Sequence, residues 1–189
     1  MTIRAIIFDM DGTLTESYIN WPDLRSKINC PPEKTIIEHI DNLPAKQRKQ
    51  ANDILLQQEW EAAQHAAIRT GATELIDALR ARKYKLGLVT NNHGAAMHCV
   101  INRLNRAFDI ALSRDDGPIK PSPYLIHKTL QALDTSPNEA ISIGDSRYDL
   151  MASAAARVRC IHFTDGASDL THDLQVASLP AIIPLLDRL

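Results

Sequence analysis

Hydrophobic positions along this chain form two patterns, short apolar runs rich in β-branched residues and longer stripes with helical spacing. The apolar runs are typical of strands buried on both faces, and they cover residues 3–8, 85–89, 110–112, 140–143 and 158–163. The helical stripes lie between and after them, at residues 72–83, 93–104, 122–133, 146–156 and 179–189. Strands that alternate with helices predict parallel βαβ units. We therefore expect an α/β fold with a doubly wound, mostly parallel, Rossmann-like sheet.

Two helix starts carry recognisable capping residues. Ser122 is followed by Pro123, which predicts an N-cap at Ser122 and a proline at the first helical position. Ser136 has Glu139 three residues later, the spacing of a capping box, and this pair predicts a short helical turn.

Residues 16–68 interrupt the alternation directly after the first strand. They contain no convincing strand, are rich in Gln, Glu, Lys and Ala, and are divided by prolines into about three helices. The helical stripe predicted to be buried consists of Leu56, Trp60, Ala63 and Ala67. Trp21 and Trp60 are expected in the interior of this segment. We therefore predict an α/β core formed by residues 1–15 and 69–189, with residues 16–68 inserted as a small helical cap.

The composition narrows the classes of function. A formal net charge of −2 gives no electrostatic footprint for nucleic acid, and no apolar run approaches the roughly 18 residues of a membrane span. The apolar stretch after Arg4 is short and runs into Asp9, unlike a signal or transit peptide. Cys30, Cys99 and Cys160 are far apart and odd in number. We expect reduced, mostly buried thiols in a cytoplasmic protein that binds neither nucleic acid nor membrane.

Polar side chains follow the predicted strands at their carboxyl ends. They are Asp9 and Asp11 after the first strand, Thr90 and Asn91 after the second, and Asp145 and Asp149 after the fourth. Lys120 lies in the loop after the third strand, and Gly12 forces a turn after the first. Because ligands of such sheets bind outside the carboxyl ends of the strands, we expect these residues to converge.

Convergent carboxylates need a cation or a proton between them. At ~4 Å and an effective dielectric constant near 20, two like charges cost roughly 4 kcal/mol. Asp9, Asp11 and Asp145 offer hard oxygen ligands, and no His or Cys converges with them. This ligand set favours Mg²⁺ as the cofactor.

The same residues suit a phosphoryl group. Lys120 adds a positive charge, and Thr90 and Asn91 add neutral hydrogen-bond donors. Asp9 is a competent nucleophile towards phosphorus. Asp11, two residues on, points the same way in an extended segment, so it can protonate the leaving oxygen and later activate water.

Four short sequences resemble, in order, the four motifs of the haloacid dehalogenase-like superfamily. They are Asp9-Met10-Asp11-Gly12-Thr13-Leu14, Thr90-Asn91, Lys120-Pro121 and Gly144-Asp145-Ser146-Arg147-Tyr148-Asp149. The place of residues 16–68, between the first and second motifs, is similar to that of the cap in the phosphoglycolate-phosphatase-like branch. Many relatives carry a glycine near residues 156–157, where this chain has Ala156-Arg157, a difference that affects a turn.

The resemblance implies a magnesium-dependent phosphatase that works through an aspartyl-phosphate. By this resemblance, Asp9 is the nucleophile, and Asp11 is the general acid/base and also offers its backbone carbonyl to the metal. Thr90 and Lys120 bind the phosphate. Asp145 is a metal ligand, and Asp149 supports either the metal shell or Lys120. A small cap suits a small phosphorylated metabolite such as phosphoglycolate. The physiological substrate and the choice between monomer and dimer stay open.

Two other functions use similar residues. A sugar phosphomutase of the same superfamily would convert β-glucose 1-phosphate to glucose 6-phosphate without releasing phosphate. A receiver-like signalling domain also surrounds a phospho-aspartate with acids, Thr and Lys. In a receiver, however, the acidic pair precedes the phosphorylated aspartate in the sequence, and there is no helical insertion. Rapid phosphate release from p-nitrophenyl phosphate would exclude a receiver-like domain. A dehalogenase needs no acid at the position of Asp11, which argues against that activity.

Further polar residues are weaker candidates. His93 either touches substrate or starts a helix at the surface. Arg25, Arg48 and Lys49 either neutralise a substrate carboxylate or belong to a solvated face. Residues 115–116, both Asp, form either a solvated turn or a metal site.

Overall fold

A parallel β-sheet forms the centre of the protein, whose computed structural model describes residues 2–164 and 172–189. Its strands are β1 (Ala5–Phe8), β2 (Lys85–Val89), β3 (Ile110–Leu112), β4 (Ala140–Gly144), β5 (Arg159–Phe163) and β6 (Gln175–Val176). They lie in the order β3-β2-β1-β4-β5-β6, and every neighbouring pair is parallel. This order changes direction between β1 and β4, where ligands of doubly wound sheets bind. The predicted fold class is confirmed.

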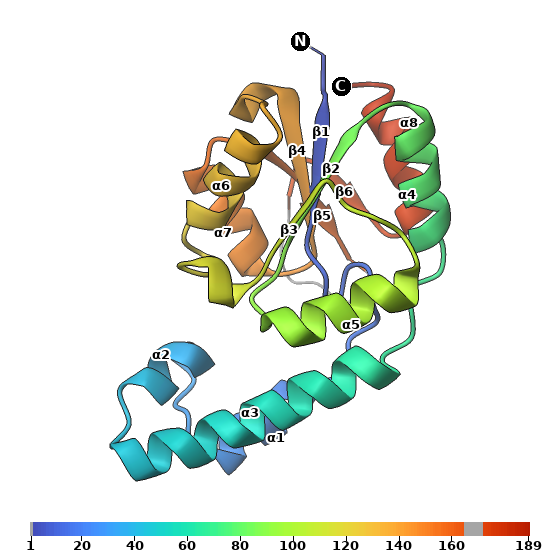
Figure 1. Cartoon of the computed structure of the whole chain (residues 1–189). Coiled ribbons are helices and arrows are strands. Elements are labelled where there is room, and N and C mark those ends of the chain that lie inside the picture. The colour runs from blue at the N-terminus through green and yellow to red at the C-terminus, as the bar shows by residue number, and fades with distance from the viewer. Residues whose placement is uncertain (1, 165–171) are drawn as a thin grey trace.

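Helices cover both faces of the sheet (Figure 1). On one face lie α4 (Ala72–Ala81), α5 (Gly94–Leu104) and α8 (Ile182–Leu186), and on the other lie α6 (Tyr124–Ala132) and α7 (Arg147–Ala155). Alternate side chains of each strand serve the two layers. In β1, Ile6 and Phe8 join the core beneath α4 and α5, whereas Ala5 and Ile7 join the core beneath α6 and α7. Because both faces are covered, all four residues of the central strand β1 are apolar and buried.

Most predicted element positions are confirmed, and two differ. Helix α6 begins at Tyr124 and not at Pro123, because Ser122 N donates to Ile119 O (2.9 Å) and so belongs to the preceding turn. The predicted helix over 179–189 is a 3₁₀ turn, Leu179–Ala181, followed by the short α8. Strand β6 has two residues and left no periodic signal in the sequence.

Local turn chemistry agrees well with the sequence. Ser136 and Glu139 form the predicted capping box around the 3₁₀ turn Pro137–Glu139. Arg157, at the place where many relatives have glycine, has φ of +59°. This left-handed conformation is the one that favours glycine, so the sequence difference concerns a turn. Cys30 and Cys160 are buried free thiols, and Cys99 is a partly buried one, as expected.

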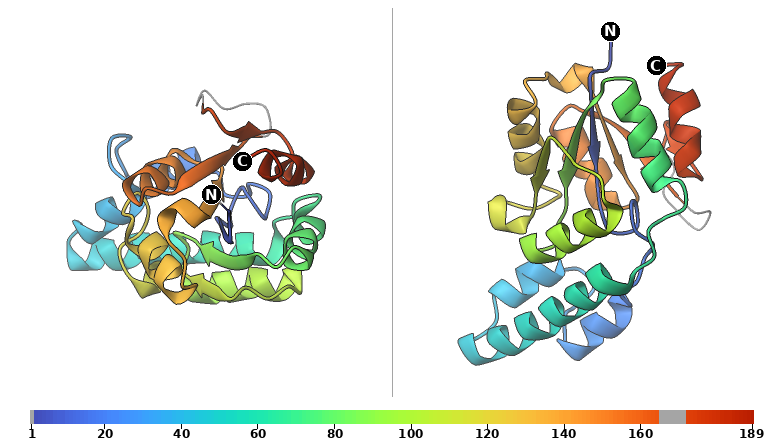
Figure 2. Two further views of the ribbon diagram at one scale, coloured as in Figure 1. Left: turned by 90° about the horizontal axis from the view of Figure 1, so that it is seen from above. Right: turned by 45° about the vertical axis from the view of Figure 1, so that its right-hand side comes forward.

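Helices α1 (Trp21–Lys27), α2 (Ile36–Asp41) and α3 (Ala45–His65) form a separate layer, here called the helical segment (Figures 1 and 2). It lies beyond the carboxyl ends of the strands, at the opposite end from both termini. Its interior is a small apolar cluster of its own, made of Leu24, Ile28, Cys30, Ile36, Ile40, Ala51 and Leu55.

Two adjacent chain crossings join the helical segment to the sheet domain. Glu16 N donates to Ala67 O (2.9 Å), and Arg69 N donates to Leu14 O (2.9 Å). The outgoing and returning chains are therefore held side by side by backbone hydrogen bonds. Within the part of the chain that the structure describes, no helix is long and apolar enough to cross a membrane.

The buried face of α3 differs from the prediction. The buried residues of this helix are Ala51, Leu55, Glu59, Ala62 and Ala63. Trp60 is 42% exposed, Ala67 lies exposed beyond the helix, and Leu56 is only half-buried. Trp21 is also exposed, at 45%. The interior positions predicted for both tryptophans are wrong. On α3, a buried glutamate, Glu59, occupies the stripe in place of an apolar residue.

Neighbouring leucines of α3 should therefore differ in their effect on stability. We expect Leu55→Ala to lower the free energy of unfolding by about 2–5 kcal/mol, because it opens a cavity at a side chain that is 1% exposed. The matched variant Leu56→Ala should cost less than about 1 kcal/mol. Urea unfolding measures both, and a larger loss for Leu56→Ala would restore the sequence-predicted face.

Candidate active site

Asp9 and Asp145 come together where the sheet order changes direction. Asp9 follows the last residue of β1, and Asp145 follows the last residue of β4. Asp9 N donates to Ile143 O (2.9 Å), which extends the pairing of the two strands as far as the site. Both residues therefore owe their positions to rigid neighbouring strands.

Lys120 joins the acids in the interior. Its ammonium lies 2.5 Å from Asp9 Oδ1 and 2.5 Å from Asp149 Oδ1, and it also donates to Val89 O (3.1 Å). All three charged side chains are less than 10% exposed. Burial lowers the pKa of Lys120, but Asp149 and Asp9 outweigh it and raise this pKa above its usual value. The lysine is thus held as a fixed positive charge.

The side chain of Asn91 positions the loop that carries Lys120. Asn91 Nδ2 donates to Lys120 O (2.9 Å), and Lys120 N donates to Asn91 Oδ1 (2.9 Å). Both functional atoms of the amide are thereby used on the backbone of Lys120. This contact supports a positioning role for Asn91, and its predicted role as a direct phosphate ligand stays a prediction.

Asp149 belongs to a capping box at the start of α7. Ser146 Oγ (2.5 Å) and Ser146 N (3.0 Å) both donate to Asp149 Oδ2, while the other oxygen receives Lys120. The helix start therefore aims this carboxylate at the lysine. Ser146 was not predicted as a site residue, although its spacing to Asp149 equals that of the capping box recognised at Ser136 and Glu139.

Asp145 is held by partners that sequence reasoning missed. Thr13 Oγ1 donates to Asp145 Oδ1 (2.9 Å), and the fully buried His162 places Nε2 3.1 Å from Asp145 O. Gly12, with φ of +85°, passes directly under the same carboxylate, since a Cβ built there would lie 2.3 Å from Asp145 Oδ2. Only glycine allows this close approach without a shift of Asp145.

Asp11 faces the end of β2. Its Oδ2 accepts from Asn92 Nδ2 (3.1 Å), and Thr90 Oγ1 lies 3.4 Å from the same oxygen. Burial raises the pKa of Asp11, although the hydrogen bond from Asn92 opposes this. A raised pKa suits a group that must give and take a proton near neutral pH. Asn92 is a further supporting residue that the sequence did not single out.

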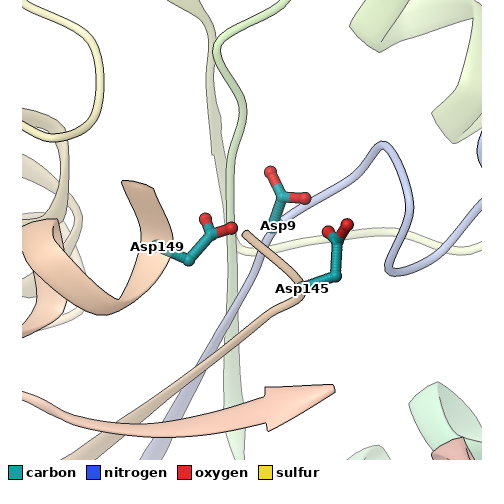
Figure 3. Close-up of side chains that lie close together, drawn as sticks. All are labelled: Asp9, Asp145 and Asp149. Carbon is teal, nitrogen blue, oxygen red and sulfur yellow. The ribbon is translucent and has the colours of Figure 1, made fainter. Parts of the chain in front are cut away.

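The tight carboxylate cluster differs in one member from the predicted ligand set. Oxygens of Asp9, Asp145 and Asp149 all lie within 4.8 Å of one another (Figure 3). The side chain of Asp11 is not part of this group, and its predicted metal ligation, which the family resemblance assigns to its backbone carbonyl, stays a prediction. Among the described residues, side-chain donors bind only the Oδ1 atoms of Asp9 and Asp145. By contrast, both carboxylate oxygens of Asp149 accept hydrogen bonds.

This donor set fits Mg²⁺. Burial raises the pKa of Asp9 well above its usual value, and Asp149 and Asp145 add to the effect. Burial and then Asp149 raise the pKa of Asp145 to about 6. The single positive charge of Lys120 therefore does not balance the negative charge of the carboxylate cluster. A hard divalent cation between Asp9 and Asp145 would relieve that repulsion, and oxygen ligands are what Mg²⁺ takes.

The helical segment and the acids enclose one pocket of about 490 Å³. Its lining includes Asp9, Asp11, Thr90, Asn91, Asn92, Lys120, Asp145, Ser146 and Tyr148 from the sheet domain, and Trp21, Arg25, Ile36, Ile37, Leu55 and Glu59 from the helical segment. Residues far apart in sequence thus face a single space.

An ion pair ties the helical segment to the sheet domain beside this pocket. Arg114 follows β3 and donates to both carboxylate oxygens of Glu59 on α3, at 2.5 and 2.8 Å. The two side chains are 13% and 5% exposed. Arg114 also donates to Asn91 O (3.3 Å), so the same guanidinium touches the residue that positions Lys120. No local sequence signal pairs residues this far apart.

The weaker candidates separate clearly. Arg48 donates to Leu43 O and Lys49 pairs with Asp53, and both arginine and lysine lie outside the pocket. His93 is the N-cap of α5 and accepts from Ala96 N (3.3 Å). Asp115 accepts from Gly94 N at the start of α5, and Asp116 belongs to the capping box of the 3₁₀ turn Arg114–Asp116. Of these residues, only Arg25 lines the pocket.

Comparisons with known proteins agree with this geometry. The family model described as haloacid dehalogenase-like hydrolase matches residues 6–163. A haloacid dehalogenase-like hydrolase domain-containing protein of Arabidopsis thaliana is 30% identical over 98% of this chain and 84% of its own length. A pyrophosphatase of Bacillus cereus is 26% identical over 82% of this chain and 81% of its own length. The crystal structure of a predicted phosphoglycolate phosphatase from Haemophilus somnus shares the fold, with a TM-score of 0.75, 19% identity and 97% of each chain covered.

Removal of one partner should show that the Glu59–Arg114 pair holds the helical segment. We expect Arg114→Ala to lower the free energy of unfolding by about 3–5 kcal/mol, because it leaves Glu59 as an unpaired buried carboxylate. The matched control Lys49→Ala, which breaks an exposed pair on the same helix, should cost less than about 1 kcal/mol. Chemical unfolding measures both, and equal small losses would contradict a stabilising contact.

Proposed function

The chain belongs to the haloacid dehalogenase-like hydrolase family, and we propose that it is a magnesium-dependent phosphatase that hydrolyses a phosphomonoester through an aspartyl-phosphate on Asp9. The observation that carries this proposal is the buried Asp9 carboxylate, 2.5 Å from Lys120 and clustered with Asp145 at the floor of a pocket. The names of two similar proteins, a pyrophosphatase and a predicted phosphoglycolate phosphatase, also support phosphate chemistry.

In the first step, a carboxylate oxygen of Asp9 attacks phosphorus in line with the leaving group. The bond between phosphorus and the ester oxygen breaks, and Asp11 gives its proton to the departing alkoxide. The raised pKa of Asp11 favours the protonated form that this step needs. Lys120 and Thr90 face the same space and stabilise the charge on the phosphoryl oxygens.

In the second step, water attacks the phosphorus of the aspartyl-phosphate. Asp11, now ionised, takes a proton from this water, the bond between phosphorus and Asp9 breaks, and phosphate is released. Asn92 and Thr90 hold the Asp11 carboxylate in place for both transfers. Together the two steps return Asp11 to its protonated form, so this one side chain serves the whole cycle.

Magnesium, when bound, supplies positive charge next to the transferred phosphoryl group, and Asp9 and Asp145 are the side chains that would hold it. The backbone carbonyl of Asp11 is a third proposed ligand. Asp149 has a different part in this scheme, because its oxygens are engaged by Lys120 and Ser146. It keeps the lysine charged and in position.

We propose that residues 16–68 act as a cap over residues 1–15 and 69–189. The helical segment supplies one wall of the pocket, and the paired crossings at Glu16–Ala67 and Leu14–Arg69 are where it joins the sheet domain. A docked cap excludes bulk water from Asp9 while the phosphoryl group is transferred, which favours attack by the carboxylate over direct hydrolysis.

Loss of the nucleophile should abolish turnover. We expect Asp9→Asn to lower kcat for p-nitrophenyl phosphate by about 10³-fold or more, because an amide cannot form the acyl phosphate. Asp53→Asn, an exposed acid on α3, is the matched control and should leave kcat unchanged. Phosphate release measures both, and near-normal turnover by Asp9→Asn would refute the proposed nucleophile.

Magnesium should stabilise the protein more at higher pH. The folded-state pKa of Asp145 is raised from 3.8 to about 6, so the stability cost of ionising this group grows as pH rises from about 3.8 to about 6 and is complete above this range. Bound Mg²⁺ favours the ionised form and removes that cost. We expect EDTA-treated protein to gain more in Tm from Mg²⁺ at pH 7.5 than at pH 5, with activity lost in EDTA and restored by Mg²⁺.

Two results would contradict the metal proposal. One is an equal change in Tm at the two pH values, which would separate the cation from the carboxylate cluster. The other is recovery of activity with Zn²⁺ alone, because Zn²⁺ favours nitrogen and sulfur ligands that the cluster lacks. Asp145→Asn is the matched variant, and it should lose most of the Tm gain at pH 7.5.

A further inference from the structure

The pocket has two chemically different ends. Its floor carries Asp9, Asp145 and Lys120, which serve the phosphoryl group in the proposed function. The opposite wall, here called the roof, is supplied mostly by the helical segment and carries five large apolar side chains beside four polar ones. The apolar residues are Trp21, Ile36, Ile37, Leu55 and, from the sheet domain, Ile119, and the polar ones are Ser17, Arg25, Thr35 and Glu59.

The roof is held close to the floor in this structure. Leu55 and Glu59 lie one turn apart on α3, and Glu59 is fixed by its two short contacts with Arg114. A buried, two-pronged ion pair of this kind fixes geometry as well as charge. The pocket volume of about 490 Å³ therefore belongs to the docked arrangement of the helical segment.

That volume exceeds the needs of a very small ester. Pockets of about 300–1,000 Å³ are typical of drug-sized ligands, which are much larger than a phosphorylated two-carbon acid. The roof side chains that are exposed to water, Trp21 at 45% and the half-buried Ile37, would also gain nothing from a small polar leaving group. A hydrocarbon or aromatic body that displaces this water would gain binding free energy in proportion to the apolar area buried.

Charge does not favour an acidic leaving group. Besides Lys120, Arg25 is the cationic side chain among the described pocket residues. Its Nη1 donates to Pro31 O (3.0 Å) and Lys34 O (2.9 Å), which fastens the loop between α1 and α2. Nη1 of the guanidinium therefore already has a structural task, and Glu59 adds a negative group to the same wall.

Trp21 is the side chain best placed to recognise an apolar body. It is the first residue of α1, a helix start fixed by Asn20 Oδ1, which accepts from Asp23 N (3.1 Å). The interior of the helical segment takes Leu24 from this helix, and leaves the indole 45% exposed at the pocket. Trp60 is similarly exposed on α3 but does not line the pocket.

Resting on the proposed phosphatase function, we propose that the substrate is the phosphate ester of a bulky, mainly apolar alcohol, whose hydrocarbon or aromatic body binds against Trp21 and Ile37. The phosphoryl group lies at Asp9 and Lys120, and the body extends towards the helical segment. The roof residues therefore select among esters, whereas the floor residues carry out the hydrolysis.

Three esters of primary alcohols test this proposal because they share the same type of leaving oxygen. They are 2-naphthylmethyl phosphate, ethyl phosphate and phosphoglycolate. For the wild-type protein we expect kcat/KM for 2-naphthylmethyl phosphate to exceed the other two by at least about tenfold. Trp21→Ala should lower kcat/KM for 2-naphthylmethyl phosphate more than kcat/KM for ethyl phosphate and so remove most of this preference. Trp60→Ala, the matched control, should change neither value.

Two outcomes would overturn the substrate class while leaving phosphatase activity intact. One is equal or better turnover of phosphoglycolate or ethyl phosphate by the wild-type protein. The other is an equal loss for all three esters in Trp21→Ala, which would show a general defect. If no ester is hydrolysed, the proposed function fails, and calorimetric binding of 2-naphthylmethylphosphonate against ethylphosphonate still decides the inference. Tighter binding of the naphthyl compound that depends on Trp21 supports it, and equal binding refutes it.

Discussion

The ammonium of Lys120, buried between Asp9 and Asp149, is the interaction on which the arrangement of the site depends. Two carboxylates this close in a low-dielectric interior repel strongly, and the ammonium between them offsets part of that repulsion. Each partner is secured by a separate element. Asp9 extends β1, Asp149 caps α7, and the amide of Asn91 holds the backbone of Lys120. The acids, the lysine and the helix start therefore form one structural unit, and a change to any of them disturbs the others.

The helical segment is connected to this unit through Arg114. This guanidinium binds Glu59 on α3 and the carbonyl oxygen of Asn91, whose side chain in turn positions Lys120. A short chain of polar contacts thus links the pocket wall formed by the helical segment to the cation beside Asp9. The contacts give a physical route by which the position of the helical segment can affect the charge balance at Asp9, since neither end of the route is a flexible surface group.

The strands and the convergence of Asp9, Lys120 and Asp145 followed from the sequence because apolar runs mark buried strands and parallel strands bring their carboxyl ends together. The finer geometry depended on contacts that periodicity does not encode. Gly12 turns the chain under Asp145, so the side chain of Asp11 faces Asn92 and not the carboxylate cluster. The buried face of α3 was misplaced because Glu59 looks like a surface residue until its distant partner is known. Ser146 and Asp149, by contrast, carried a capping signal that was available and overlooked.

The two adjacent crossings between the helical segment and the sheet domain have an evolutionary consequence. Because the outgoing chain at Glu16 and the returning chain at Ala67 are already side by side, the intervening residues can be replaced by another helical module without rerouting any strand. The segment also has its own apolar interior, so most of its packing would travel with it. New ligand preferences can then arise by exchange of one contiguous stretch of gene, while Asp9 and its supporting charges are inherited unchanged.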